Sequence, residues 1–511
     1  MSDQLDKRIS FEIENNITYN EEGYYIKNKN KSSIFNKSKV TVVSPVYNAE
    51  NFLRKTIDSV INQTIGFKNI EYILVDDGST DSSREILLEY AEAYKNIIVV
   101  FLKNNTGTPA QPRNLGIKLA KSDYITFLDA DDWLDKEGLK SLYSIIKRSN
   151  DDYIVGKTIE VGSKGKKIVG EYESCLERRN VSPFSIPHIF HHLGPRARMM
   201  KLKFLKEYNI EYPEMKFAED KQFFIDVLIH CKSISTTTQV IYYLNRLDDN
   251  DASLTKQTDV MEKMDTNIKV IKYVKSKKLD TEKEKMILNR LYEFDSITRL
   301  FNRHHFLKSE NNEEYFNKFQ EVIDTTKDLN YDISESFFHP INKVAYDLFL
   351  KGHYDDIKKL YKWDKKEKIK NYVILNNLPY MSGPLSSEKN KHIRVPMLAI
   401  FHSGSFIQDS YTLSLDIYGD YVNEVQHIVL RDRKNITQEY IFPLAVNESG
   451  RATAKFDLES LDQLNSSSYE VFVRYKDYQK LYISKKEQVV FNKRSFNFYT
   501  TINSNLGFKI N

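Results

Sequence analysis

The chain has 511 residues, 41% of them hydrophobic, which is enough for two or three separately folded domains. Lys and Arg number 75 against 71 Asp and Glu, and this near balance argues against a nucleic-acid-binding protein. Two cysteines argue against a disulfide framework, and we find neither a signal peptide nor an apolar run that would span a membrane. These features predict a soluble intracellular protein.

Residues 1–37 are polar and predict an N-terminal extension rather than a domain. Over residues 38–256, strand-like apolar runs alternate with helix-like runs, beginning with VTVVSPVY and AENFLRKTIDSVINQT. This alternation predicts an α/β domain with a mostly parallel, Rossmann-like sheet. Ligands of such sheets bind beyond the carboxyl ends of the strands, so polar residues at those ends are the first candidates for a site.

Three of the predicted strands end in polar residues, at 44–47, 76–79 and 129–132. All three sets would lie on one rim of the sheet. After this domain the pattern changes twice. Residues 257–390 are charged and helix-like and predict a helical linker domain, whereas residues 391–511 have a period of two, as in YTLSLDIYG, and predict a C-terminal β-sandwich of the immunoglobulin-like kind.

The strand end DADD is a D-x-D pattern. Asp129 and Asp131 would project to the same side of an extended chain. Two such carboxylates suit a hard divalent cation that also holds substrate phosphates. Because Asp is also a favoured helix N-cap, the pattern alone leaves both interpretations open.

The other rim segments also have two interpretations each. Asp76 and Asp77 in VDDGSTD could accept hydrogen bonds from a nucleoside, or they could begin an Asx turn. Arg113 lies near the start of a predicted helix, where the helix dipole does not favour a cation, so it is either a diphosphate or carboxylate contact or a surface arginine. Glu219 and Asp220 open another predicted helix, where acids complement the dipole or supply a general base.

Some patterns argue against other chemistries. The histidines of HIFHH have no partner at a metal-ligand spacing, so we interpret them as structural or acceptor-contacting. Cys175 and Cys231 lack the spacing of a thiol nucleophile or a metal site. The sequence contains neither a Walker-type loop nor a G-x-G-x-x-G loop, which argues against an NTPase or a dinucleotide enzyme.

Together, the segments VSPVYNAENFLRKTIDSVINQT, EYILVDDGSTDSS, PRNLGIKLAKSDYITFLDADD and FAED resemble a family-2 glycosyltransferase of the GT-A fold, over residues 40–255. The segments NNTGTPAQPRN and NIEYPEMKFAEDKQFF, followed by a helical linker and a β-sandwich, are similar to the wall teichoic acid glycosyltransferases that attach N-acetylglucosamine (GlcNAc) to poly(ribitol phosphate). The resemblance implies inverting transfer from a UDP-sugar, with UDP-GlcNAc as the expected donor and Mn²⁺ or Mg²⁺ as cofactor.

The resemblance also implies roles for individual residues. Asp220 would be the catalytic base with Glu219 beside it, and Asp131 with Asp129 would bind the metal. The residues that would bind the nucleotide-sugar are Pro45, Tyr47, Asp76, Asp77, Asn105, Arg113, Asp129, Arg246 and Ser253. The basic residues that would contact an anionic acceptor are Arg196 and Arg198, with Lys201 and Lys203 as further candidates, and their alternative is a solvated helix face.

The implied partners are a UDP-sugar donor and an anionic polyol-phosphate or polysaccharide acceptor, with no nucleic acid. The β-sandwich would assemble a homotrimer or, alternatively, bind carbohydrate, and the protein would be cytoplasmic, working at the inner face of the plasma membrane. The N-terminal extension and the room for only one sandwich depart from the family pattern. Two other functions stay open: a capsular, exopolysaccharide or glycoprotein glycosyltransferase, and an inactive UDP-sugar-binding assembly protein.

Overall fold

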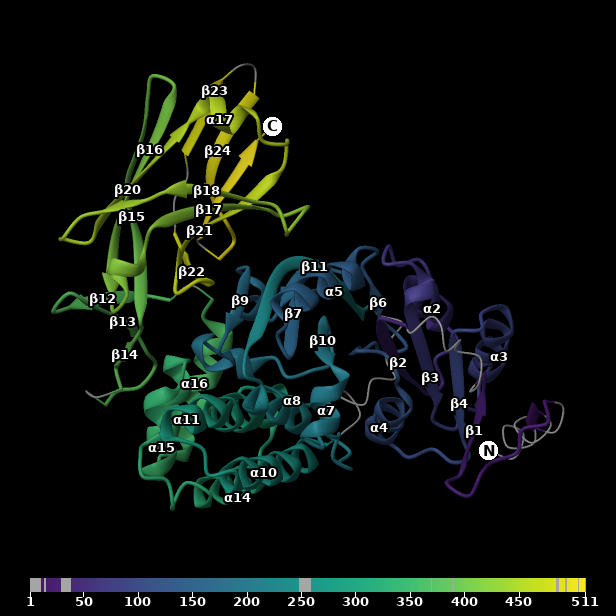
Figure 1. Ribbon diagram of the computed structural model, residues 1–511. Helices are drawn as coiled ribbons and strands as arrows, with labels where there is room; N and C mark the ends of the chain where they lie inside the picture. Colours follow the sequence, from purple (N-terminus) through teal and green to yellow (C-terminus); the bar gives the residue numbers. More distant parts are fainter. Residues whose placement is uncertain are drawn as a thin grey trace. The chain divides into compact units, whose positions relative to one another are not determined.

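The computed structural model describes most of the chain, namely residues 11–12, 15–28, 38–247, 259–368, 370–387, 390–483, 487–491, 494–503 and 505–510. Internal contacts divide the chain into two units, Met1–Arg290 and Leu291–Asn511 (Figure 1). The predicted domain boundaries after residues 37, 256 and 390 stay predictions. Among the described residues, none of the helices combines the length and apolar composition needed to cross a bilayer.

The first unit is built on one mixed sheet whose central strands are parallel. The order is β4 (Ile97–Leu102), β3 (Ile70–Asp76), β2 (Val40–Val46) and β5 (Tyr124–Phe127). Every residue of β3 is buried, as expected for a parallel strand that is covered on both faces. Helix α4 (Ala110–Leu119) packs on β2 and β3, and α3 (Ser83–Ala93) packs on β4 (Figure 1). The predicted α/β sheet is confirmed.

This strand order determines where a ligand would bind. The chain adds β3 and β4 on one side of β2 and then β5 on the other side, so the direction of winding reverses between β2 and β5. Ligands of open α/β sheets bind at such a switch point, beyond the carboxyl ends of the strands. Strands β2, β3 and β5 lead into the three polar sets that the sequence indicated.

Beyond β5 the sheet becomes mixed. Strand β10 (Arg198–Lys201) pairs antiparallel with β5 and β7 (Tyr153–Gly162), and β11 (Ile234–Arg246) joins β7 to β6 (Trp133–Leu134). At the opposite edge, β1 (Tyr24–Lys27) pairs antiparallel with β4. Part of the predicted N-terminal extension is therefore a sheet strand, which the polar residues around YYIK concealed.

The helix predicted to begin at Glu219 and Asp220 is present as α8 (Glu219–His230). The remaining elements of this unit are α2 (Leu53–Ile61), η1 (Phe67–Asn69), α5 (Gly138–Ser149), β8 (Gly165–Val169), α6 (Glu171–Ser174), β9 (Arg178–Val181), η2 (Pro183–Ser185), η3 (Ile189–His191), α7 (Leu202–Glu207), α10 (Val260–Ser276) and α11 (Thr281–Asn289).

The second unit begins with helices, of which the longest are α14 (Glu313–Asp324), α15 (Pro340–Leu350) and α16 (Tyr354–Lys366). Strand β13 (Leu378–Ser382) then pairs antiparallel with β12 (Tyr372–Leu375) on one side and β14 (His392–Arg394) on the other. Both β12 and β13 lie within the segment predicted to be helical up to residue 390. The sequence did not predict these strands, because strands of 4 and 5 residues are too short to show a clear period of two.

The predicted β-sandwich follows as two antiparallel sheets. Leu413 and Leu415 from one sheet share a hydrophobic core with Val471 and Phe498 from the other. The first sheet contains β15 (Met397–Ile407), β16 (Ser410–Gly419), β20 (Arg451–Asp457) and β19 (Ala445–Val446). The second contains β18 (Glu439–Pro443), β17 (His427–Asp432), β21 (Ser468–Tyr475), β22 (Gln479–Tyr482), β25 (Leu506–Ile510), β24 (Arg494–Thr500) and β23 (Glu487–Phe491).

Candidate active site

Arg113 brings two of the predicted catalytic segments together. Its side chain, on α4, donates from Nη2 to Asp129 over 2.8 Å and from Nη1 to Glu219 over 3.2 Å. The guanidinium also lies 5.1 Å from the centre of the Tyr212 ring, and Arg113 is only 4% exposed. Arg113 therefore compensates the charge of two acids, one at the end of β5 and one at the start of α8. In this structure both acids occupy its guanidinium, which is buried and does not face solvent where a diphosphate could reach it.

Glu219 and Asp220 are adjacent acids at the start of α8, and the pKa of each is raised. Ala218, just before α8, has a φ of +71°, a left-handed conformation that residues with a Cβ rarely adopt. Burial and the charge of Asp220 raise the pKa of Glu219 to about 7. Burial also raises the pKa of Asp220, against the lowering effect of Arg113, Lys221 and Arg196.

Within the described part of the chain, Arg113 pairs with Glu219, whereas no ion pair involves Asp220. Asp220 is also partly exposed, in contrast to the buried Glu219. A carboxylate that accepts a proton from a substrate must be both reachable and uncommitted. Of the two acids, Asp220 meets this requirement.

The segment DADD (residues 129–132) is anchored by its fourth residue, Asp132. Asp132 is 1% exposed and accepts hydrogen bonds from the Tyr242 hydroxyl at 2.6 Å and the Asn245 amide at 2.7 Å. Thr56 donates to the carbonyls of Ala130 and Asp132. Thr56 and Tyr242 were missed by sequence reasoning, because a buried hydroxyl within an apolar pattern gives no local signal.

Asp129 and Asp131 remain partly exposed at this anchored strand end. The described residues contain no group of three or more His, Cys, Asp or Glu side chains arranged to hold a metal ion. Two carboxylates at a rim fit Mg²⁺ or Mn²⁺ only where a substrate supplies further oxygens, which is the usual mode for cations bound with phosphates.

Asp76 was predicted to bind the nucleotide, and the structure corrects this. Its carboxylate is fully buried and accepts a hydrogen bond from Nε of Arg84 at 2.7 Å and from the amide of Ser79. A buried carboxylate that is committed to a buried guanidinium is not available to a ligand. Asp76 is therefore a structural residue beneath the rim.

Asp77 and Gly78 instead join two rim loops. Asp77 accepts hydrogen bonds from the amide and hydroxyl of Thr106, each at 2.9 Å, and burial raises its pKa to about 6. Gly78 has a φ of +73°, and a Cβ there would lie 2.8 Å from the amide nitrogen of Asn105. Asn105 and Tyr47 are exposed beside this junction, Tyr47 by 51%.

The remaining predicted nucleotide-binding residues are described only in part. Pro45 is partly exposed near the end of β2. Arg246 ends β11, is exposed, and donates to the carbonyl of Asn245. Ser253 and the predicted closing loop lie outside the described residues.

Arg198 was predicted to contact the acceptor, but the structure places its side chain in the core. It is 1% exposed and pairs with Glu173 over 2.9 Å, because it points into the core from β10 and is not on a solvated helix face. Lys201 is bonded to Asp152 and the carbonyl of Asn150, and Lys203 is exposed. Arg196 is partly exposed.

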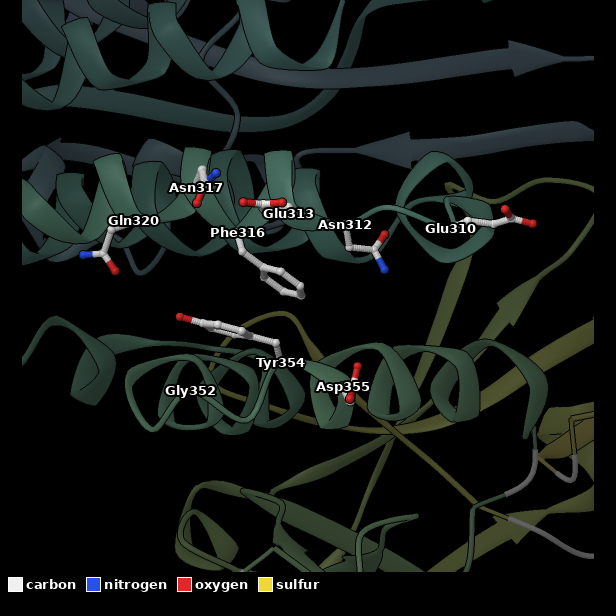
Figure 2. A pocket seen from close by; sticks show the side chains of 9 residues that line it. All are labelled: Glu310, Asn312, Glu313, Phe316, Asn317, Gln320, Gly352, Tyr354 and Asp355. Atoms are coloured by element: carbon white, nitrogen blue, oxygen red, sulfur yellow. The ribbon is translucent and has the colours of Figure 1, made fainter.

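A hollow of about 610 Å³ lies in the second unit, between the first turns of α14 and α16 (Figure 2). Phe316 and Tyr354 stack there with ring centres 4.5 Å apart. The carboxylates that line it are Glu310, Glu313 and Asp355. Acids in a first turn complement the helix dipole, which accounts for Glu313 and Asp355 without a ligand.

The sequence model of the family described as "Glycosyl transferase family 2" matches residues 41–209. An uncharacterized glycosyltransferase of Haemophilus influenzae is 33% identical over 202 residues, which are 38% of this chain and 73% of that protein. The chain belongs to glycosyl transferase family 2. The predicted glycosyltransferase domain is thereby confirmed.

Two further relatives carry more specific names. The poly(ribitol-phosphate) β-glucosyltransferase of Bacillus spizizenii is 36% identical over 207 residues, or 40% of this chain and 32% of that enzyme. The poly(ribitol-phosphate) β-N-acetylglucosaminyltransferase TarP of Staphylococcus aureus is 35% identical over 210 residues, or 40% of this chain and 62% of that enzyme. The matches thus span about one third to two thirds of these relatives.

Solved structures support the fold over a longer range. The crystal structure of S. aureus TarS matches 93% of this chain and 85% of its own, with a TM-score of 0.56 and 17% identity. A TarS fragment in complex with UDP-GlcNAc matches 70% of this chain and 99% of its own, with a TM-score of 0.56 and 20% identity. The predicted combination of a GT-A domain, helices and C-terminal β-structure is confirmed.

Proposed function

We propose that this glycosyltransferase moves GlcNAc from UDP-GlcNAc to a hydroxyl of poly(ribitol phosphate) wall teichoic acid, with inversion at the anomeric carbon. The observation that carries the proposal is the convergence of Asp129, Arg113 and Glu219, which leaves Asp220 uncommitted at the same rim. The relatives from Bacillus and Staphylococcus, which are named as poly(ribitol-phosphate) glycosyltransferases, support the acceptor class, and TarP, named as an N-acetylglucosaminyltransferase, supports GlcNAc as the sugar.

The reaction would be a single displacement. Asp220 removes the proton of the acceptor hydroxyl while its oxygen bonds to the anomeric carbon. The bond from that carbon to the diphosphate oxygen breaks on the opposite face, and UDP leaves with the electron pair. One base opposite the leaving group gives inversion, whereas retention through a glycosyl-enzyme would need a nucleophile on the other face.

The chain's own residues would prepare this step. Arg113 keeps Asp129 and Glu219 in place through direct hydrogen bonds, and Asp220 is not one of its hydrogen-bond partners. Asp77 and Gly78 hold the Asn105 loop against the strand ends, where the nucleoside would bind. Asp131 and Asp129 would hold Mn²⁺ or Mg²⁺, which when bound supplies positive charge for the departing diphosphate.

The decisive experiment is UDP release from a panel of UDP-sugars, with Mn²⁺ or EDTA, with and without purified poly(ribitol phosphate). Release from UDP-GlcNAc that needs both metal and polymer is the expected result. Release from UDP-glucose instead would reassign the donor. Activity with a capsular polysaccharide or a glycoprotein alone would overturn the acceptor, and UDP binding without turnover of any donor would favour the inactive assembly protein.

We also propose that the β-sandwich assembles the chain into a homotrimer that works at the inner face of the plasma membrane. The proposal for assembly rests on the family resemblance, and light scattering of the full chain tests it. A trimer mass supports assembly, whereas a monomer that binds polymer through the sandwich would make this part a carbohydrate-binding module. Sedimentation with anionic vesicles tests the membrane association.

A further inference from the structure

A five-residue loop, His192 to Arg196, is clamped at both ends by one buried side chain. Arg198 donates from Nη2 to the carbonyl of His192 and from Nη1 to the carbonyl of Arg196. Glu173 fixes Arg198 in turn through a 2.9 Å contact. Ala197 between the two arginines has a φ of +57°, so the backbone turns sharply here. The conformation of Arg196 is thus determined by buried contacts.

The sheet register places this loop at the rim. Strand β10 runs antiparallel to β5, with Met200 opposite Ile125 and Lys201 opposite Tyr124. Thr126, near the carboxyl end of β5, donates to the carbonyl of Arg198, and the Arg198 guanidinium lies 5.0 Å from the centre of the Phe224 ring on α8, so the loop enters β10 beside the carboxyl end of β5. That is the strand end where Arg113, Asp129 and Glu219 converge.

A neutral histidine holds the Arg196 side chain. His192 contacts Glu173 through Nδ1 at 2.5 Å and Nη2 of Arg196 through Nε2 at 3.4 Å. An ionised carboxylate only accepts and a guanidinium only donates, so His192 must carry its proton on Nδ1 and accept at Nε2. Burial lowers the pKa of His192 to about 4, which agrees with the neutral form.

This arrangement leaves the charge of Arg196 uncompensated. Arg113 and Arg198 each pair with a carboxylate, but none of the ion pairs among the described residues involves Arg196. The buried Nε of Arg196 has no hydrogen-bond partner. The guanidinium packs against Gly194, where a Cβ would lie 2.9 Å from Nη2, so a larger residue there would displace the end of the Arg196 side chain.

We propose that Arg196 is a positioning residue of the active site, held by the Glu173–His192 pair without losing its charge, and that this charge keeps the base Asp220 ionised. The inference rests on the proposed function. The other groups that act on Asp220 are Arg113 from α4, Glu219 and Lys221 from α8, and Tyr212 from the segment before α8. Arg113 is shared with two acids, whereas Arg196 is not.

The pH dependence of transfer tests the role of the charge. A base works only when it is deprotonated, and removing a nearby cation raises its pKa, so R196Q should move the acidic limb of the kcat/KM profile upward by roughly one pH unit. Above the limb, R196Q should approach the wild-type rate, and R196K should shift less. R179Q, which removes an exposed arginine paired with Glu177, is the matched control and should leave the profile unchanged.

The histidine provides the second comparison. Gln at position 192 can donate to Glu173 and accept from Arg196, so H192Q should keep the wild-type profile, whereas H192L should shift it in the same direction as R196Q. Superimposable profiles for R196Q and wild type would overturn the proposal. A higher KM for the polymer without a shifted limb would also overturn it, because Arg196 would then bind acceptor phosphate instead.

A measurement on the full chain that needs no turnover separates this inference from the proposed function. Long-range proton–nitrogen spectra of the ¹⁵N-histidine-labelled protein, assigned with H192Q, should give His192 as the Nδ1–H tautomer, unchanged from pH 8 to about 5.5. The opposite tautomer, or protonation near the ordinary pKa, would refute the holding of Arg196 even if no donor were turned over. An inactive wild type with the expected spectrum would overturn only the proposed function.

Discussion

Asp76 and Arg84 form an ion pair in the core of the first unit, with Nε of Arg84 2.7 Å from Oδ2 of Asp76. The two residues are 0% and 2% exposed. Arg84 also donates to the carbonyl of Leu102, at the end of β4, and to Glu12 in the N-terminal segment. The pair therefore connects the carboxyl ends of β3 and β4 beneath the rim of the sheet.

Removing Arg84 should destabilise this unit strongly. In R84M, Asp76 would be a buried charge without its main partner, a situation that costs about 3–5 kcal/mol in proteins. We expect the first thermal unfolding transition to fall by roughly 5–10 °C, measured by scanning calorimetry. The matched control is R54M, which breaks the exposed pair between Arg54 and Glu89 and should leave the transition unchanged. Equal stability of the two variants would contradict the structural role of Asp76.

The same pair illustrates what the sequence could and could not predict. The alternation of strands and helices and the polar strand ends sufficed for the parallel sheet and its rim, because both depend on local periodicity. Asp76 and Asp77 look equivalent in VDDGS, however, and only Arg84 on the following helix draws Asp76 into the core. Arg198 was misassigned for the same reason, since its partner Glu173 lies 25 residues away on another element.

Gly78 should be essential for the junction between the two rim loops. Ala at this position would place its Cβ 2.8 Å from the Asn105 amide and would adopt a strained φ of +73°. We expect G78A to weaken UDP binding about tenfold or more in calorimetric titrations, since a strained residue costs of order 1–3 kcal/mol. G23A is the control, because Gly23 has a φ of +79° but no neighbouring atom within 4 Å of its Cβ. Equal losses in both variants would exclude the loop contact as the cause.

Metal binding should depend on Asp131 and on the nucleotide together. We expect Mn²⁺, followed by electron paramagnetic resonance, to bind the wild type tightly only in the presence of UDP, because the diphosphate would complete the ligand set. D131N should weaken this binding at least tenfold. D135N is the comparison, since Asp135 contacts the Tyr243 hydroxyl at 3.1 Å and should not be a ligand. Tight Mn²⁺ binding by D131N would refute the proposed metal site.

Asp220 should be required for turnover but not for donor binding. D220N removes the base while keeping the shape of the side chain, so polymer-dependent UDP release should fall by about 10²–10⁴-fold. The affinity for UDP, measured by titration, should stay within about twofold. D226N, on the same helix, should retain most of the activity, because Asp226 binds Tyr273 and Lys277 instead. Loss of UDP binding in D220N would indicate a nucleotide-binding role.

Glu219 should make the stability of the first unit depend on pH. Burial and Asp220 raise its pKa to about 7 in the folded protein, against 4.5 for the free side chain. The folded state then holds a proton that the unfolded state releases between these values, so stability falls as pH rises through that window. E219Q removes the effect, and its unfolding temperature relative to wild type should rise between pH 5 and 8 in calorimetry. A parallel course of the two curves would mean that Arg113 keeps Glu219 ionised throughout.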